Sequence, residues 1–249
     1  MTNVFRKMCI FGALAFVAAC SVAPAGVEIH DPYEATNRAI HQFNKDRDQG
    51  FLRPAGVAAT NLPVEVTTPV TNFADNVGLP GAIANGVLQA DIGGVGTNTM
   101  RFLINTTIGI GGLFDPAGAI GLREQSTDFG ETLAVWGVPE GAYVELPFLG
   151  PSTERDAAGQ VVDIIFDPLS SVGTAPQITY GTYTRVADRI ITRGQFAQTI
   201  DSVLYESADS YAAARLAYLQ NRRFELGEEP PASEVIDPFA SDFSLEGFE

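Results

Sequence analysis

The side chains that most often carry chemistry are scarce in this sequence of 249 residues. It holds two cysteines, Cys9 and Cys20, and two histidines, His30 and His41. Two histidines are too few for a histidine-based zinc cluster, and they lack the spacing of a metalloprotease. Ser152 lacks the flanking glycines of a nucleophile elbow, and a serine lipase would have to use one of these two histidines as its base. We therefore expect a protein that is not an enzyme and that binds no metal.

The glycine-rich stretch at 107–116, TIGIGGLFDP, raises the question of phosphate binding. A phosphate loop needs Gly-Lys followed by Ser or Thr, and none follows here. The dinucleotide-binding spacing counted from Gly109 would need a glycine at the position of Phe114. The stretch therefore predicts no nucleotide site, and we expect no cofactor.

The amino terminus has the pattern of a signal peptide. Two basic residues precede an apolar run at 8–19, which is too short to cross about 30 Å of hydrocarbon. The run ends in VAAC at 17–20, which resembles a bacterial lipobox, so residues 1–19 would be removed and Cys20 would be acylated. The alternative is an ordinary secretory peptide that happens to have a cysteine at the cut. Ser21 after the cysteine favours sorting to the outer membrane, and no thiol would remain for a disulfide.

The chain is strongly acidic, with 15 Lys and Arg against 30 Asp and Glu. Long-range attraction to nucleic acid or to an anionic membrane surface is therefore unfavourable, and we expect no nucleic-acid partner. Residues 225–249 carry eight acidic residues and no basic one, which predicts a disordered tail. The alternative for this tail is a short docking motif built on Phe239, Phe243 and Phe248.

Capping signatures and helical periodicity predict most other elements. Asp31-Pro32 followed by Glu34 is typical of a helix start with Asp31 as the N-cap, and it predicts a helix over 32–48. The same Asp-Pro signature recurs at Asp115, Asp167 and Asp237. Two more helices are predicted over 186–204 and 211–224.

A further helix is predicted over 91–108, where apolar residues recur at steps of three and four. Asn98, Arg101 and Asn105 recur at the same steps on another face, which gives this helix a narrow polar stripe. The segment at 142–148 suggests a strand, and 160–166 favours a helix over a strand. The sequence therefore predicts one mostly α domain.

Several short motifs follow one another in a specific order, and together they strongly resemble the VacJ/MlaA lipoprotein family. They are Asp31-Pro32-Tyr33-Glu34 with Asn37-Arg38, Arg53-Pro54, Arg101-Phe102 with Asn105-Thr106, Gly109 to Asp115, Asp128 to Leu133 leading to Trp136-Gly137, and Leu146 to Ser152 with Arg155-Asp156. The resemblance divides the chain into a signal peptide at 1–19, an acylated linker at 20–30, a helical domain at 31–224 and the acidic tail at 225–249. The chain departs from the family pattern at 45–48, which is more charged, and at Glu145.

The resemblance implies a ring of amphipathic helices embedded in the outer membrane of a Gram-negative bacterium, with a central amphipathic channel. Such a lipoprotein belongs to the Mla pathway, removes phospholipids that have strayed into the outer leaflet, and passes them to a periplasmic lipid carrier for retrograde transport to the inner membrane. It also implies association with a trimeric porin, and use of no cofactor. The alternative function is a structural lipoprotein that tethers partner proteins without moving lipid.

On this reading, Asn98, Arg101 and Asn105 are candidates for the polar wall of the channel, along which a headgroup would pass. The alternative for Arg101 is an ion pair with a buried carboxylate that holds two helices together. Gly109, Gly111 and Gly112 would form a flexible hairpin beside the channel, because glycine adopts positive φ without a Cβ clash. The alternative is a close-packed turn between helices that does not move.

Overall fold

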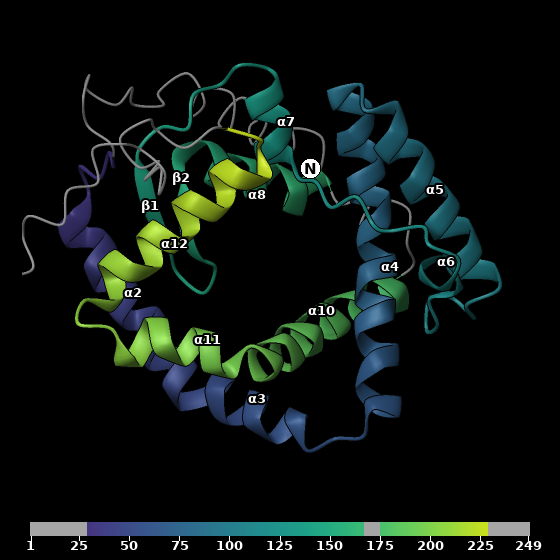
Figure 1. Cartoon of the computed structure of the whole chain (residues 1–249), viewed down its shortest axis with the longest axis horizontal. Helices are drawn as coiled ribbons and strands as arrows, with labels where there is room; N and C mark the ends of the chain where they lie inside the picture. The colour runs from purple at the N-terminus through teal and green to yellow at the C-terminus, as the bar shows by residue number, and fades with distance from the viewer. Residues whose placement is uncertain (1–28, 167–174, 229–249) are drawn as a thin grey trace, which may run out of the picture.

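A computed structural model describes residues 29–166 and 175–228. Most of these residues are helical, and the elements follow one another around a ring (Figure 1), so the predicted mostly α, ring-like fold is confirmed. The elements are α2 (Glu34–Arg47), η1 (Asp48–Leu52), α3 (Arg53–Thr60), α4 (Val64–Gln89), α5 (Ile92–Thr107), α6 (Pro116–Ala119), α7 (Phe129–Val135), β1 (Tyr143–Leu146), β2 (Gly150–Thr153), α8 (Glu154–Phe166), α10 (Ala175–Gln195), α11 (Ala197–Asp201), η2 (Ser202–Glu206) and α12 (Ser210–Glu225). The predicted signal peptide, Cys20, the Asp-Pro signatures at 167 and 237, and the acidic tail lie outside the described residues.

The first predicted helix start is wrong by a few residues. The helix α2 begins at Glu34 after Tyr33, and no side chain caps it. Asp31 instead accepts hydrogen bonds from Asn37 Nδ2 at 2.9 Å and from the side chains of Tyr211 and Arg215 on α12. A carboxylate that pairs with a guanidinium and a phenol at once gains more than a single cap bond to a backbone amide. The residue therefore ties α2 to α12.

The helix α4 continues through two prolines. Pro69 and Pro80 both lie inside a continuous helix of 26 residues. Its packing against α5 and α10 compensates for the backbone hydrogen bonds that the two prolines remove. Among the helices of the described ranges, none is long and apolar enough to cross a membrane.

The predicted strand at 142–148 is confirmed as β1, and the predicted helix at 160–166 as part of α8. The sequence did not predict β2, which pairs antiparallel with β1 from Tyr143 opposite Thr153 to Leu146 opposite Gly150. Asn44 on α2 holds the tip of this hairpin. Its Nδ2 donates to the Leu146 carbonyl at 3.0 Å, and its Oδ1 accepts from the Phe148 amide at 2.8 Å.

The predicted helix at 186–204 is split into three pieces. The helix α10 ends at Gln195, α11 starts after Phe196, and η2 follows as a π-helix. An ion-pair network holds this region to η1, which is also a π-helix. Arg193 binds Asp48 and Asp201, Arg53 binds Asp201 at 2.7 Å, and the Tyr205 hydroxyl donates to Asp48 at 2.8 Å. These contacts stabilise the bend between α10 and α11, because a straight helix would place Asp201 too far from Arg193 for an ion pair.

The helices α7 and α8 cross where two glycines meet. A Cβ atom on Gly159 would lie 2.3 Å from the Gly130 amide nitrogen and 2.7 Å from its Cα. A Cβ atom on Gly130 would in turn lie 2.5 Å from Asp156 Oδ1. The backbones therefore pack directly against each other, and this crossing closes the upper part of the ring (Figure 1).

Candidate functional site

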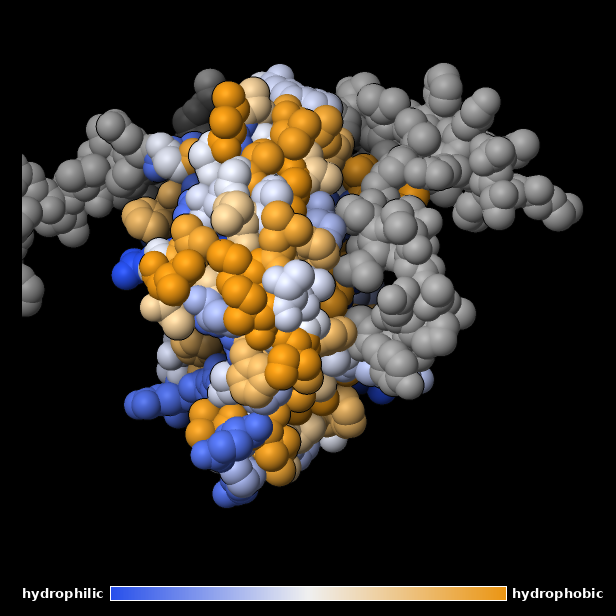
Figure 2. Space-filling view, turned by 90° about the vertical axis from the view of Figure 1, so that its right-hand side faces the viewer, coloured by the Kyte–Doolittle hydropathy of each residue, from blue (hydrophilic) through white to orange (hydrophobic). Residues whose placement is uncertain are grey.

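An apolar surface covers the outer side of α4, α5 and α6. Figure 2 shows hydrophobic side chains running down this face almost without interruption. The large exposed apolar residues of these elements and the turns that join them include Val64, Val66, Val87, Leu88, Ile92, Met100, Leu103, Ile108, Ile110, Leu113, Phe114 and Ile120. Soluble monomers rarely expose a contiguous apolar patch of this kind, which makes this face a candidate contact surface.

The helix α5 exposes its apolar face and buries its polar face, which is the reverse of a helix in a water-soluble protein. Ile92 is 86% exposed, whereas Asn98 is 1% and Arg101 6% exposed. Helices in water normally bury their apolar face and expose the polar one. The predicted polar stripe therefore points into the protein, and the apolar residues face outward.

Each residue of the polar stripe binds the segment at 115–125, which folds back along α5. Asn98 makes two hydrogen bonds with the backbone of Gln125, donating at 2.8 Å and accepting at 3.1 Å. Asn105 donates to Asp115 Oδ1 at 2.8 Å and accepts from the Ala117 amide at 3.1 Å. The stripe therefore fixes this segment against α5.

Arg101 is bound by the same segment. Its guanidinium donates to the Leu122 carbonyl and lies 3.3 Å from Asp115 Oδ2. The sequence leaves two alternatives for Arg101, a place in the channel wall and an ion pair with a carboxylate. These contacts correspond to the ion pair. The role in the channel wall stays a prediction for Asn98, Arg101 and Asn105.

Asp115 has a further role as the N-cap of α6, as its Asp-Pro signature predicts. Its side chain accepts from the Gly118 amide at 2.9 Å. Partial burial alone would raise the pKa of the Asp115 carboxyl, but the amide, Asn105 and Arg101 together hold this pKa below its ordinary value. Asp115 is therefore the anion that keeps the buried Arg101 paired.

More carboxylates surround Arg101 than it can neutralise. Glu124 Oε2 lies 4.0 Å from Arg101 Nη2, and Asp75 on α4 interacts with both Arg101 and Glu124. Burial raises the pKa of both carboxyls, and the charge of Asp188 on α10 raises that of Asp75 further. Both residues nevertheless contact solvent. No spacing in the sequence indicated this group, because its members come from separate segments.

The glycine stretch forms a turn directly after α5. Ile110, Gly111 and Gly112 all have positive φ, at 55°, 71° and 96°. Backbone hydrogen bonds close the turn, from the Gly112 amide to the Asn105 carbonyl at 2.8 Å and from the Phe114 amide to the Gly109 carbonyl at 3.0 Å. The predicted turn is thus present, and its apolar side chains belong to the exposed surface of Figure 2.

The glycines of this turn differ in how closely they are packed. A Cβ atom on Gly109 would lie 2.4 Å from the Phe114 carbonyl oxygen, and one on Gly112 would lie 2.6 Å from Asn76 Nδ2. A Cβ atom on Gly111 would meet nothing within 4 Å. Close packing at Gly109 and Gly112 is the geometry of the close-packed turn, and motion of the hairpin stays a prediction.

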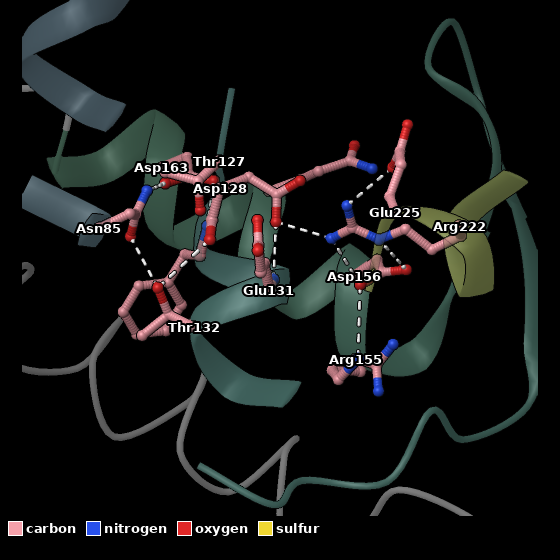
Figure 3. Close-up of polar contacts among 12 residues, drawn as sticks. Asn85, Thr127, Asp128, Glu131, Thr132, Arg155, Asp156, Asp163, Arg222 and Glu225 are labelled. Carbon is pink, nitrogen blue, oxygen red and sulfur yellow. Dashed lines mark hydrogen bonds and ion pairs between the residues drawn. The ribbon is translucent and has the colours of Figure 1, made fainter. Parts of the chain in front are cut away.

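A second polar network joins α4, α7, α8 and α12 (Figure 3). Arg222 is its centre, at 2.7 Å from Asp128 Oδ1 and 3.2 Å from Asp156 Oδ1. On the other side, Asp163 accepts from Asn85 Nδ2 at 3.0 Å, and Asn85 accepts from the Thr132 hydroxyl at 3.2 Å. The network fastens α12 across the crossing of α7 and α8.

Asp156 is the most strongly held carboxylate of this network. Burial alone would raise the pKa of its carboxyl, but Arg222, the Tyr218 hydroxyl and Arg155 together lower this pKa below its ordinary value. The network therefore holds Asp156 ionised. Within residues 29–166 and 175–228, no group of three or more His, Cys, Asp and Glu has the arrangement of a metal site.

The sequence and the fold are both similar to known proteins. The family described as "MlaA lipoprotein" matches residues 29–225. The "Intermembrane phospholipid transport system lipoprotein MlaA" of Escherichia coli (strain K12) is 36% identical over 199 residues, which are 78% of this chain and 77% of that protein. The protein of the same description from Haemophilus influenzae is 29% identical over 207 residues, 81% of each chain.

Proteins of Rickettsia species are similar to the chain to about the same degree. An "Uncharacterized protein" of Rickettsia bellii is 36% identical over 202 residues, 78% of this chain and 76% of that protein. A solved structure described as "Structural basis for maintenance of bacterial outer membrane lipid asymmetry" superimposes with a TM-score of 0.67 at 33% identity, covering 79% of this chain and 98% of that chain.

Proposed function

Because this chain belongs to the MlaA lipoprotein family, we propose that it is the outer-membrane component of an intermembrane phospholipid transport system. In this role it removes mislocalised phospholipids from the outer leaflet and passes them to a periplasmic lipid carrier for retrograde transport to the inner membrane. The result is maintained lipid asymmetry of the outer membrane. Transport of this kind breaks no covalent bond, so it needs no catalytic residue.

The observation that carries the proposal is the inverted burial of α5. Ile92 is 86% exposed and Asn98 1% exposed, which is the arrangement expected of a helix that has hydrocarbon outside and polar groups inside. Amphipathic helices that lie in a membrane without crossing it bury their apolar face among acyl chains. The ring would therefore sit within the outer membrane, with the face shown in Figure 2 in contact with lipid.

The polar path for a headgroup would run along the inner side of α5 and the segment at 115–125. Asn98, Arg101 and Asn105 form the wall by holding this segment in place, and exposed Asp75 and Glu124 present charge to the passing lipid. The acyl chains would stay near the apolar surface. The glycine turn, with Gly109, Gly111 and Gly112, would be the movable hairpin beside this path.

The remaining parts of the proposal concern attachment and partners. Cys20 would carry the lipid anchor, a trimeric porin would hold the protein in the membrane, and the periplasmic carrier would receive the phospholipid. The lipobox at 17–20 and the match to a lipoprotein family support the anchor.

The experiment that tests the function measures phospholipid in the outer leaflet of cells that lack this protein. Wild type and Cys20→Ala are expressed in parallel at matched levels. We expect surface phospholipid to rise in the deletion and to return to normal only with the acylated wild type. An unchanged outer leaflet in the deletion would reject lipid transport and leave the tethering function in its place.

A further inference from the structure

Three side chains from distant parts of the chain meet at the side of the ring formed by α2, β1 and α12 (Figure 1). Ser210 Oγ, at the start of α12, lies 3.1 Å from His41 Nε2 on α2. The other ring nitrogen of the same histidine, Nδ1, lies 3.5 Å from Glu145 Oε1 on β1. Serine, imidazole and carboxylate thus form a line, with the histidine in the middle. No sequence motif indicated it, because 169 residues separate His41 from Ser210.

The groups around Glu145 keep it an acceptor facing His41. Glu145 is 3% exposed and accepts from the Tyr143 hydroxyl and from Asn44 Nδ2 at 3.2 Å. A carboxylate held in this way can only accept. Its contact with His41 Nδ1, which at 3.5 Å is a charge contact and not a hydrogen bond, favours the tautomer with the proton on that nitrogen. His41 Nε2 then accepts from the Ser210 hydroxyl. The edge of the His41 ring also packs against Tyr211, with ring centroids 5.7 Å apart, which restricts its rotation.

A cation lies on the other side of the serine. Lys45 Nζ donates to Ser210 Oγ at 3.3 Å. A positive charge beside Ser210 Oγ stabilises the negative charge that develops on this oxygen as its proton leaves. Ser210 is also the first residue of the 16-residue helix α12, whose amino-terminal dipole acts in the same sense.

Access fits this arrangement. Ser210 is half-buried and follows Asp209, which is exposed, whereas His41 and Glu145 are buried behind it. The serine therefore lies nearer to the surface than its base and the carboxylate.

We propose that Ser210 and His41 are catalytic residues of a carboxylic-ester hydrolase, with Glu145 as the positioning residue of His41. The Ser210 oxygen attacks the ester carbonyl and forms a new C–O bond, while its proton moves to His41 Nε2. The ester C–O bond then breaks, and the alcohol leaves with the proton from His41. Water attacks the acyl-serine, gives its proton to His41, and the serine oxygen recovers this proton as the carboxylic acid leaves.

The simplest competing reading is that Ser210 and Glu145 merely satisfy a buried histidine. The two readings differ in the reactivity of Ser210, because only a serine with an activating base reacts rapidly with an alkyl fluorophosphonate. The test uses the purified full-length protein in detergent, an alkyl fluorophosphonate probe, and peptide mass spectrometry to locate the label. Hydrolysis of p-nitrophenyl butyrate is measured with the same samples.

We expect the probe to label Ser210 in the wild type and not to label Ser210→Ala. The variant His41→Gln should lose about 10²-fold to 10⁴-fold in labelling and hydrolysis rate, the range lost when a general base is removed. Glu145→Gln should lower kcat while KM stays within a factor of two, because it orients the base without touching the ester. Ser207→Ala is the matched control, since its hydroxyl donates to the Val203 carbonyl and lies outside the line; it should react like the wild type.

Unfolding temperatures of all variants are measured in parallel, so that a lost fold is not taken for a lost base. Equal labelling of the wild type and Ser210→Ala, or labelling that His41→Gln leaves unchanged in a folded protein, would overturn the proposal. The ester hydrolase is independent of lipid transport. Ser210→Ala should therefore still restore the outer leaflet of the deletion strain.

Discussion

Asp48 and Arg193 form a two-pronged ion pair in the interior of the protein, although 145 residues separate them in the sequence. Arg193 Nε donates to Asp48 Oδ1 at 2.7 Å, and Nη2 donates to Oδ2 at 2.8 Å. The pair joins η1 to α10 at the point where the ring bends. Both side chains are buried, and Asp201 and the Tyr205 hydroxyl complete their hydrogen bonds.

The variant Asp48→Asn should therefore destabilise the protein strongly. The variant leaves the buried Arg193 with Asp201 as its remaining carboxylate, and breaking a buried ion pair costs up to about 3–5 kcal/mol. Urea unfolding in detergent measures the difference. Arg53→Gln is the control, because it removes the more exposed pair with Asp201, and exposed pairs contribute much less to stability than buried ones. Equal effects of the two variants would show that the buried pair is not important for stability.

The turn after α5 predicts unequal effects for two neighbouring glycines. Alanine at Gly111 meets nothing within 4 Å, so Gly111→Ala should cost about 1–2 kcal/mol through its positive φ alone. Gly112→Ala should cost more, because the added Cβ would lie 2.6 Å from Asn76 Nδ2. Thermal unfolding and lipid transport are measured for both. If the hairpin moves during transport, both variants should alter lipid transport. If the turn is rigid, transport should fall only in the variant whose unfolding temperature falls.

The contacts of Arg101 predict a structural effect for Arg101→Gln. The variant loses the ion pair with Asp115 and the bond to the Leu122 carbonyl, each of which contributes about 1.5–3 kcal/mol when a charged group is involved. We expect a lower unfolding temperature and a proportionate loss of transport, with exposed Arg123→Gln as the control. Preserved stability with lost transport would instead favour a direct role in binding the headgroup.

The network around Arg222 predicts a dependence of stability on pH. The pKa of Asp156 is lowered in the folded state, so its contribution is fully present above the unfolded pKa of about 4 and is lost as the pH falls through the folded value. The unfolding temperature should therefore fall on acidification from pH 5 to 2, and fall less in Asp156→Asn. Asp163 acts in the opposite sense, because burial raises its pKa. Exposed Asp46→Asn serves as the control, and identical slopes in both variants would contradict the prediction.

The sequence predicted correctly those helices whose formation depends on residues close together in the chain. The periodicity of 91–108, the Asp-Pro cap at Asp115 and the final helix all correspond to observed elements. The periodicity of α5 gives two faces but does not say which one is inside, since that depends on whether water or lipid surrounds the protein. The polar stripe was thus found from the sequence, and its burial was not.

The features that the sequence did not predict depend on contacts between distant segments. The strand β2 forms because β1 and Asn44 hold its hairpin, and α10 is separated from α11 where Arg193 reaches both Asp48 and Asp201. The carboxylates around Arg101 and the line from Ser210 to Glu145 likewise come together only in the folded chain. Such groups cannot be recognised from the sequence, because Asp, Glu and Ser occur throughout so acidic a chain.

The crossing of Gly130 and Gly159 restricts how this sequence can diverge over generations. A single methyl group at either position would overlap atoms of the other backbone or of Asp156. The first substitution would therefore already disrupt the fold, before a second substitution could relieve the overlap. The exposed apolar positions of α5, in contrast, can exchange one apolar side chain for another. Descendants of this protein should therefore vary fastest on this exposed apolar surface and slowest where the Gly130 and Gly159 backbones touch.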